Sequence, residues 1–343
     1  MERMVKCPNC GGAITYSPEK RALWCEHCES VFPIEVQKRD VKFLRKYTPD
    51  FMPEPIQNPV RQYMCNSCKT IHITDTEKQS KRCPSCGQTD VREVNIGATA
   101  PDTIVPFELS KEKAVEIFET WLKRRPFAPS DLRELARNGK VSKVYVPLFN
   151  ISATNVCSYS GTVKKVHEDS NNTIFSTVYP VHDVSTSDIH NYPFCANTAI
   201  DGELIQKIVN VDQTKLIPFS SDYLFGYTGA ETNKSIHEAV EFLKRAYARR
   251  AEDSVRAMLK SKYDEIVNLT CNSSLRNVTF NYLFTPVFMN HYTYKGKQYH
   301  CYIDGTTGKV AGKSPKSAGK ILALAGAVIA AIAGIAVALA IAI

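Results

Sequence analysis

The sequence predicts an α+β protein with two N-terminal four-cysteine zinc ribbons, a central mixed α+β domain and one C-terminal transmembrane helix. Three observations predict this class: four CxxC pairs near the N-terminus, helix-like and strand-like segments in the middle, and an uninterrupted apolar run at the end. The predicted parts are ribbon 1 (1–36), a linker (37–62), ribbon 2 (63–96), the α+β domain (97–312), a basic segment (313–320) and the transmembrane helix (321–343).

The composition limits the alternatives. Across 343 residues, a charged fraction of 23% and an aromatic fraction of 10% exclude wholesale disorder. A mean hydropathy of −0.24 excludes a polytopic membrane protein, although it leaves room for a single span. The net charge of +8 indicates an anionic partner only if the surplus is concentrated in one part of the chain.

Eight of the 12 cysteines form two sets of paired CxxC motifs with identical spacing, and a shift of 58 positions superimposes one set on the other. The eight are Cys7, Cys10, Cys25 and Cys28 in ribbon 1, and Cys65, Cys68, Cys83 and Cys86 in ribbon 2. Two CxxC motifs about 15 residues apart supply the tetrahedral sulfur ligands that Zn²⁺ prefers. We therefore predict two structural zinc ions, with no open position for a catalytic water.

Other uses of these cysteines fit less well. A redox CxxC needs the N-terminus of a helix in a βαβ setting, whereas these pairs lie in short strand and turn sequence. A reducing compartment disfavours disulfides. Ribbons of fewer than about 40 residues bury too little surface to fold without a cross-link such as a metal ion. In CPNCGG and CPSCGQ a glycine follows the second cysteine, where the backbone turns back toward the metal. His27 and His72 lie near complete ligand sets, so we predict surface histidines.

The charge of the ribbons favours a protein partner over nucleic acid. Residues 1–100 carry a side-chain surplus of +3, and two tetrathiolate zinc centres would bring this to about −1. The dense basic positions lie in the proline-rich linker: Lys38, Arg39, Lys42, Arg45 and Lys46. Nucleic-acid binding is the alternative, and it would depend on residues such as Arg39, Arg45 and Arg61.

The middle of the chain predicts an α+β domain. Ser110 caps a helix that ends before Pro126, Ser130 begins a short helix through Ala136, and Ser235 opens a long helix toward Leu269. Strands are expected around 141–166 and 174–184. Two pairs of phrases suggest an internal duplication: IVPF (104–107) with LIPF (216–219), and VPLFN (146–150) with TPVFM (285–289).

No catalytic residue is predicted in this domain, because no nucleotide-binding, hydrolase or metalloprotease motif occurs. The remaining cysteines show no ligand spacing and are predicted to be buried apolar residues: Cys157, Cys195, Cys271 and Cys301. An enzyme in the middle domain would require a deep pocket with converging polar groups.

The run from Ile321 to Ile343 contains no polar side chain and predicts a membrane span of about 34 Å. Four lysines precede it without an acidic residue after Lys309, and they are predicted to face an anionic membrane surface: Lys309, Lys313, Lys316 and Lys320. The positive-inside rule then predicts a single-pass, tail-anchored cell-membrane protein with its N-terminal bulk in the cytoplasm. Small residues every fourth position could support helix pairing and a homo-oligomer: Gly326, Ala330, Gly334 and Ala338.

The layout resembles a family of bacterial membrane-anchored zinc-ribbon proteins, the YdjG-like family. The resemblance rests on the CxxC ribbons, VPF (105–107), WL (121–122), FAP (127–129), YVP (145–147) and a closing phrase from Tyr294 to Pro315. Members are sometimes labelled primosomal replication proteins, and this chain contains no helicase motif. The resemblance implies recruitment of an SPFH-domain protein and a link to a PspA-type envelope-stress system.

Together these observations predict a non-enzymatic, tail-anchored membrane adaptor. It would present its zinc ribbons and α+β domain to cytoplasmic protein partners beside the lipid bilayer. A zinc-ribbon nucleic-acid-binding protein held at the membrane is the alternative function.

Overall fold

The computed structural model covers the whole chain and describes residues 6–34, 44–56, 60–74, 82–129, 132 and 141–342, without the side chains of residues 293 and 335–342. Three sequence predictions fall outside this description. They concern the basic linker positions Lys38, Arg39 and Lys42, the short helix over 130–136 (of which only Leu132 is described), and the side chain of Ala338.

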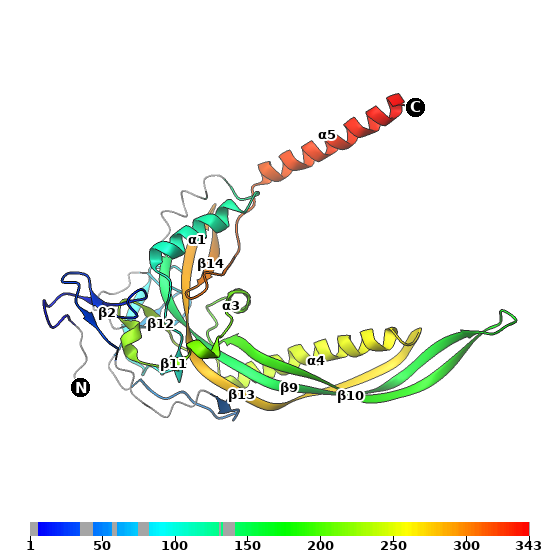
Figure 1. The fold of residues 1–343 in the computed structure, drawn as a ribbon, viewed down its shortest axis with the longest axis horizontal. Helices are drawn as coiled ribbons and strands as arrows, with labels where there is room; N and C mark the ends of the chain where they lie inside the picture. The colour runs from blue at the N-terminus through cyan, green and yellow to red at the C-terminus, as the bar shows by residue number, and fades with distance from the viewer. Residues whose placement is uncertain are drawn as a thin grey trace.

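Ribbon 1 folds into a small antiparallel sheet of its own, at the end of the molecule where the N-terminus lies (Figure 1). Its strands are β1 (Ile14–Ser17), β2 (Ala22–Cys25) and β3 (Val31–Phe32), in that order. Tyr16 joins it to the body, because its backbone N–H donates to the carbonyl of Phe225 (2.9 Å) and its hydroxyl donates to the carbonyl of Phe107 (3.3 Å).

The other described strands form one 12-stranded sheet. Its main path runs β11 (Ile217–Pro218), β8 (Thr103–Ile104), β13 (Glu265–Tyr294), β9 (Val141–Glu168), β12 (Thr228–Ala230), β6 (Ile71–Thr74), β5 (Arg61–Cys65) and β7 (Val91–Val94). Off this path, β10 (Ile174–Cys195) pairs with β9, while β4 (Arg45–Lys46) and β14 (Lys297–Asp304) pair with β13, and β15 (Val310–Gly312) pairs with β14. Ribbon 2, which comprises β5, β6 and β7, therefore continues the sheet of the central region.

The described helices are α1 (Lys111–Lys123), α3 (Gly202–Ile208), α4 (Ile236–Lys260) and α5 (Ala318–Ala342), with short 3-10 turns at Gln213–Lys215 and Ser221–Leu224. The predicted caps are present: the Ser110 hydroxyl accepts from the N–H of Lys113, and Ser235 forms a capping box with Glu238. α4 ends at Lys260 rather than near Leu269, since the strand-forming run EIVNLTC starts β13 at Glu265. The protein is therefore mostly β-sheet, and its helices are a minority.

The same order of elements occurs twice in the central region. One unit runs β8, α1, β9, β10, and the other runs β12, α4, β13, β14. Their long strands β9 and β13 are antiparallel neighbours, β8 runs parallel to β13, and β12 runs parallel to β9. The phrases VPLFN and TPVFM lie opposite each other in this pair, with Val146 across from Thr285. IVPF and LIPF also pair with each other, with Ile104 across from Ile217.

A long arm extends from the body (Figure 1). We define the arm as residues 154–168 of β9, 174–189 of β10 and 265–276 of β13, together with α4, which lies along one face of these strands. Near the body, α4 packs through Leu243 against Phe149 and Phe280, and further out Leu259 packs against Val163. The arm is therefore held by helix-on-sheet packing as far as Leu259, and the β9–β10 hairpin extends beyond the end of α4 (Figure 1).

The core of the body is aromatic and contains the phrases that carry the family resemblance. The Phe107 ring lies 5.0 Å from Tyr145 and 4.9 Å from Phe288, and all three side chains are buried. Gly305 lies so close that a Cβ there would stand 2.6 Å from the Phe107 ring. Asp304 fixes the following turn by accepting from the N–H groups of residues 306 and 307. These phrases converge in the core, which gives them a packing role.

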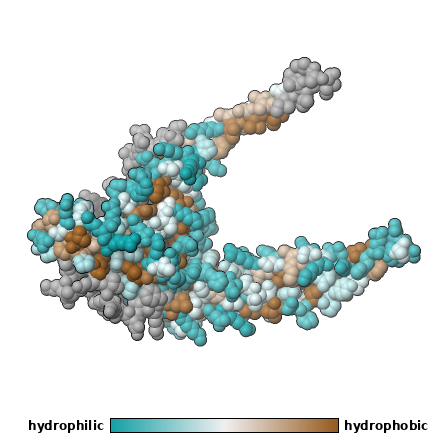
Figure 2. All heavy atoms as spheres, viewed as in Figure 1, coloured by the Kyte–Doolittle hydropathy of each residue, from teal (hydrophilic) through white to brown (hydrophobic). Residues whose placement is uncertain are grey.

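The C-terminal helix α5 projects from the body, and its described part is apolar (Figure 2). Across the part of the chain that the structure describes, no helix is long and apolar enough to cross a membrane. The predictions of a transmembrane helix over 321–343 and of a single-pass cell-membrane location are therefore wrong.

Candidate metal centres

The structure brings the eight predicted cysteines together in two clusters. We call Cys7, Cys10, Cys25 and Cys28 centre 1, and Cys65, Cys68, Cys83 and Cys86 centre 2. Within each, all four Sγ atoms lie within 4.8 Å of one another. The shortest contacts are Cys7–Cys28 (3.4 Å) and Cys10–Cys25 (3.5 Å) in centre 1, and Cys65–Cys86 and Cys68–Cys83 (both 3.7 Å) in centre 2. A tetrahedral ion with metal–sulfur bonds of about 2.3 Å needs sulfur atoms about 3.8 Å apart, so both clusters could hold a metal ion.

All four CxxC turns share the same backbone conformation. The residue after the second cysteine has a positive φ in each: Gly11 (72°), Glu29 (58°), Lys69 (59°) and Gly87 (78°). Its N–H donates to the carbonyl of the first cysteine at 2.7–2.9 Å, which closes the turn around the metal position. Two turns use glycine, as the sequence predicted, and two place a side-chain-bearing residue in the left-handed region, where it is strained.

Hydrogen bonds favour thiolate at one cysteine of each centre. In centre 1, the Ser30 hydroxyl lies 3.2 Å from the Cys28 sulfur and, with the Ser30 backbone, lowers the pKa of Cys28 to about 6. In centre 2, hydrogen bonds from Cys83 and Cys86 hold the pKa of Cys68 well below its usual value. Thiolate is the form that binds a metal ion.

His72 departs from the prediction of a surface histidine, while His27 is exposed as predicted. The His72 side chain is 2% exposed, and its Nε2 atom lies 3.2 Å from Cys83 Sγ and 3.5 Å from the Ser85 hydroxyl. Burial lowers the pKa of His72 to about 4, so the ring is neutral. The sequence does contain a signal for this burial. His72 lies in the strand sequence IHIT, four residues after Cys68, and the alternation of side chains along that strand turns its ring toward the cluster.

A histidine of the long strand β13, His291, also contacts centre 2 and is paired with His300 of β14. His291 Nε2 donates to the carbonyl of Pro84, inside the second CxxC motif, at 2.7 Å. Its Nδ1 atom then accepts from His300 Nδ1, 2.6 Å away. Burial, together with the neighbouring His300, lowers the pKa of His291 to about 4. Centre 2 is thus bonded directly to the central sheet.

The remaining cysteines do not join a cluster within the described residues. Cys157, Cys195 and Cys301 are buried, as predicted, and Cys271 is half-buried. Burial raises the pKa of both Cys195 and Cys271 to about 11. The thiols of Cys195 and Cys271 are therefore protonated packing groups.

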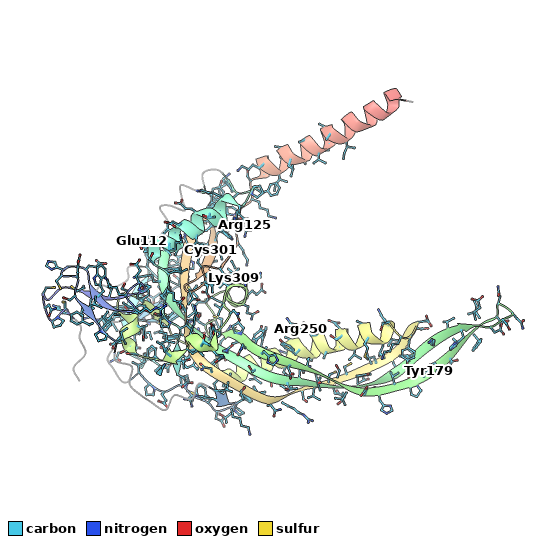
Figure 3. The ribbon with its side chains drawn as sticks, viewed as in Figure 1. Glu112, Arg125, Tyr179, Arg250, Cys301 and Lys309 are labelled. Carbon is cyan, nitrogen blue, oxygen red and sulfur yellow. The ribbon has the colours of Figure 1, made fainter. Side chains whose placement is uncertain are left out.

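The four predicted membrane-surface lysines are all exposed, but two have partners in the protein. Lys313 lies 3.4 Å from Asp201, and Lys320 donates to the carbonyl of Ala128 at 2.7 Å. Lys309 lies in the turn between β14 and β15, on the body rather than on α5 (Figure 3), and Lys316 is exposed before α5.

Among the residues that the structure describes, the small residues of α5 up to Gly334 meet no other part of the chain. A Cβ added at Gly326 or Gly334 would find nothing within 4 Å, and Ala330 is exposed.

One of the basic residues that nucleic-acid binding would use, Arg45, is engaged within the protein. The Arg45 guanidinium is bonded to the Asp102 carboxylate through two nitrogens, at 2.8 Å and 2.5 Å, and lies over the Phe51 ring. The ion pair raises the pKa of Arg45. Arg45 therefore has a structural role, because it joins β4 to Asp102 and Phe51.

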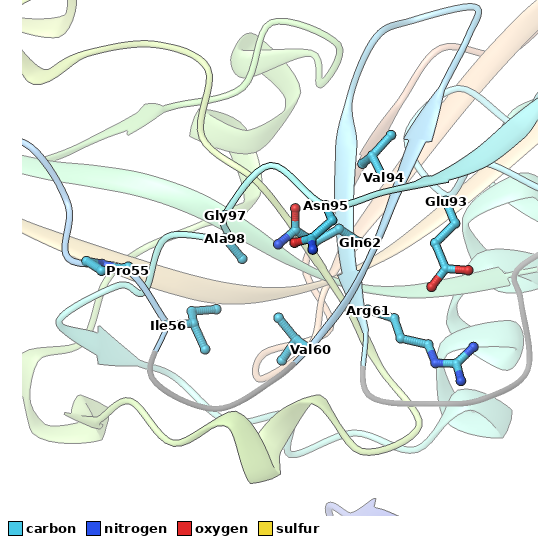
Figure 4. A pocket seen from close by; sticks show the side chains of 10 residues that line it. All are labelled: Pro55, Ile56, Val60, Arg61, Gln62, Glu93, Val94, Asn95, Gly97 and Ala98. Atoms are coloured by element: carbon cyan, nitrogen blue, oxygen red, sulfur yellow. The ribbon is translucent and has the colours of Figure 1, made fainter.

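One cavity of about 750 Å³ lies beside ribbon 2 (Figure 4). Its polar lining consists of Arg61, Gln62, Glu93 and Asn95, and Gln62 already accepts from the N–H of Ile96. The described residues that line it include no histidine, cysteine or serine.

Fold and site together define a mostly β protein with two four-cysteine clusters able to hold metal ions. The chain is similar to an uncharacterized protein, YdjG, of Bacillus subtilis (strain 168), with 24% identity over 314 residues, 90% of this chain and 89% of the relative. No family model matches the chain. No solved structure matches it either.

Proposed function

We propose that this protein is a non-enzymatic adaptor in which two structural zinc ions fix the ribbons and an extended arm contacts a protein partner. The observation that carries the proposal is the composition of the two clusters. Each supplies four cysteine sulfurs within 4.8 Å of one another. Four sulfurs fill a tetrahedral zinc site and leave no position for a catalytic water or a substrate. Zinc has no redox chemistry, so such sites support a fold.

The distal end of the arm supports a protein partner. The exposed apolar side chains there include Ile174 (73%), Val178 (55%) and Val166 (45%). The register of β9 and β10 places all three on one face of the sheet, opposite the face that α4 covers. We call these three residues the tip patch. Clustered exposed apolar side chains on a protein surface mark sites of protein contact. Figure 3 shows Tyr179, their neighbour in β10, far from the body.

The resemblance to the YdjG-like family makes an SPFH-domain protein or a PspA-type protein of the same organism the first partner to test. We expect the partner to bind the tip patch of the zinc-loaded protein. Its own apolar surface would cover Ile174 and Val178, and the nearby Lys164–Glu265 ion pair (3.0 Å) would lie at the rim of the contact.

The metal part is tested by elemental analysis of purified full-length protein. Two zinc ions per chain are expected, and Cys10→Ser should reduce the content to one. Iron in place of zinc, or fewer than two ions in the wild type, would refute this part.

The partner part is tested by pull-down of tagged full-length protein, followed by binding of the purified candidate. The double variant Ile174→Ser/Val178→Thr should lose the partner. Val184→Thr is the matched control, because Val184 is also exposed (54%), in the same strand and on the same face, but nearer the body. Equal capture by wild type and the double variant would refute the proposal. Salt-sensitive retention on DNA in place of a protein partner would favour the nucleic-acid alternative.

A further inference from the structure

The two metal centres have the same ligands but different surroundings. All four cysteines of centre 2 are buried or half-buried, whereas Cys10 of centre 1 is exposed to solvent. An exposed ligand sulfur is the position where an incoming ligand can approach the metal. The other three cysteines of centre 1 are buried or half-buried, so the approach is confined to one side.

Each centre has a hydroxyl beside one sulfur, Ser30 at Cys28 and Thr70 at Cys68, and centre 2 adds a buried histidine, His72, which in its Nε2–H tautomer donates to a ligand sulfur. His72 Nε2 lies 3.2 Å from Cys83 Sγ, within a fully buried setting. The shift of 58 positions that relates the two ribbons places Ile14 at the corresponding position of ribbon 1. Ile14 is buried at 3% exposure, but its side chain has no polar atom to offer. A donor to a thiolate withdraws charge from the sulfur and makes it a poorer site for protonation, which would release the metal.

Centre 2 is also held by a hydrogen bond from the strand β13, which lies outside ribbon 2. The Pro84 carbonyl, within its second CxxC motif, accepts from His291 at 2.7 Å, and a Cβ added at Gly87 would stand 3.0 Å from the His291 Cβ. In ribbon 1 the residue that corresponds to Pro84 is Glu26, and Glu26 is exposed. Opening of the second CxxC motif therefore requires the loss of a partly buried hydrogen bond at Pro84 in centre 2, whereas no such bond is described at Glu26 in centre 1.

We propose that centre 1 is an exchangeable metal site that passes its ion to competing thiol or chelating ligands through Cys10, whereas His72 and His291 retain the ion of centre 2. The step is a ligand exchange without redox change. A donor atom of the incoming ligand forms a bond to the metal as the bond to Cys10 Sγ breaks, and the released thiolate takes a proton from solvent. Repetition at the other three sulfurs transfers the ion.

The inference rests on the metal binding proposed above and not on the partner. Full-length protein loaded with two zinc ions is mixed with the chromogenic chelator 4-(2-pyridylazo)resorcinol in excess, and N-ethylmaleimide labels each thiol as it is freed. Zinc should leave in two phases of one equivalent each. Mass spectrometry should find the first labels on Cys7, Cys10, Cys25 and Cys28. Release of both ions in one phase, or labelling of centre 2 first, would overturn the inference. A total below two ions would instead refute the proposed metal binding.

Variants at His72 and Ile14 distinguish the effect of the hydrogen bond to the ligand sulfur from a general loss of structure. His72→Leu removes the donor and should accelerate the slow phase about tenfold, whereas His72→Gln retains an N–H group and should keep most of the slow rate. Ile14→His offers a donor to centre 1 and should slow the fast phase. Equal slow-phase rates for wild type, His72→Leu and His72→Gln would overturn the role of His72. If His72→Leu does not fold, the order of labelling in the wild type decides the proposal.

Discussion

Glu231 provides the sharpest test of the electrostatics of this fold. Its side chain follows β12, is 8% exposed, and accepts from the N–H and the hydroxyl of Thr99 through Oε1. The other oxygen, Oε2, is buried with no hydrogen-bond partner among the described residues. Burial raises the pKa of Glu231 from 4.5 to about 7. The folded state therefore favours the protonated, neutral carboxyl.

The sign and size of the pH effect follow from this pKa. Because the folded pKa exceeds the unfolded one, the folded state binds more protons between pH 4.5 and 7, and stability falls as pH rises through that window. A difference of this size corresponds to a loss on the order of 3 kcal/mol in total. Between pH 6 and pH 8, the loss is about 1.3 kcal/mol. The side-chain amide introduced by Glu231→Gln stays neutral at every pH, so the variant should lack this component.

The assay is urea unfolding at pH 6 and pH 8, followed by the fluorescence of the two tryptophans at a fixed free zinc concentration. Metal ligation adds its own pH dependence, but this is common to all variants. Glu116→Gln is the control, because the Glu116 side chain is 67% exposed on α1. Between pH 6 and pH 8, the free energy of unfolding of Glu231→Gln should fall by about 1.3 kcal/mol less than that of the control. An identical change in both variants would refute the reasoning.

Three further changes test particular contacts. Gly87→Ala should destabilise the zinc-loaded protein by more than the strain of about 1–2 kcal/mol expected for Gly11→Ala, as measured by Tm, since only Gly87 also contacts His291. Equal shifts would contradict that contact. Gly161→Ala should cost about 2–3 kcal/mol, because its Cβ would lie against a carbonyl oxygen of β13, and a neutral result would show that the strands can separate. Ser235→Ala should cost about 1 kcal/mol in urea unfolding through loss of the capping box, and an unchanged midpoint would exclude that role.

Local chemistry made part of the fold predictable. Ser110 and Ser235 open helices at the expected residues, because a side-chain oxygen at that position satisfies a free N–H of the first turn. The strands expected at 141–166 and 174–184 lie within β9 and β10. Helix ends were less certain, as the extension of α4 toward Leu269 shows, since charged sequence continues where strand formers already begin.

Burial and distant pairing were harder to predict. The composition of the C-terminal run predicts a membrane span, whereas no described helix is long and apolar enough to cross a membrane. Nothing local indicates that the strands of ribbon 2 join the central sheet through β12, because Ala230 and His72 are far apart in the chain. The same long-range pairing buries His72, which the local sequence allowed to lie at the surface.

The sequence alone determined the two sets of four thiols, because the CxxC spacing fixes which sulfurs can reach one ion. It also determined the helix starts, which depend on neighbours within one turn. The tertiary structure decided how the two clusters differ: one stands in a separate small sheet with an exposed sulfur, and the other is bonded to β13 through His291. That difference depends on contacts between residues more than 200 positions apart, which local spacing does not encode.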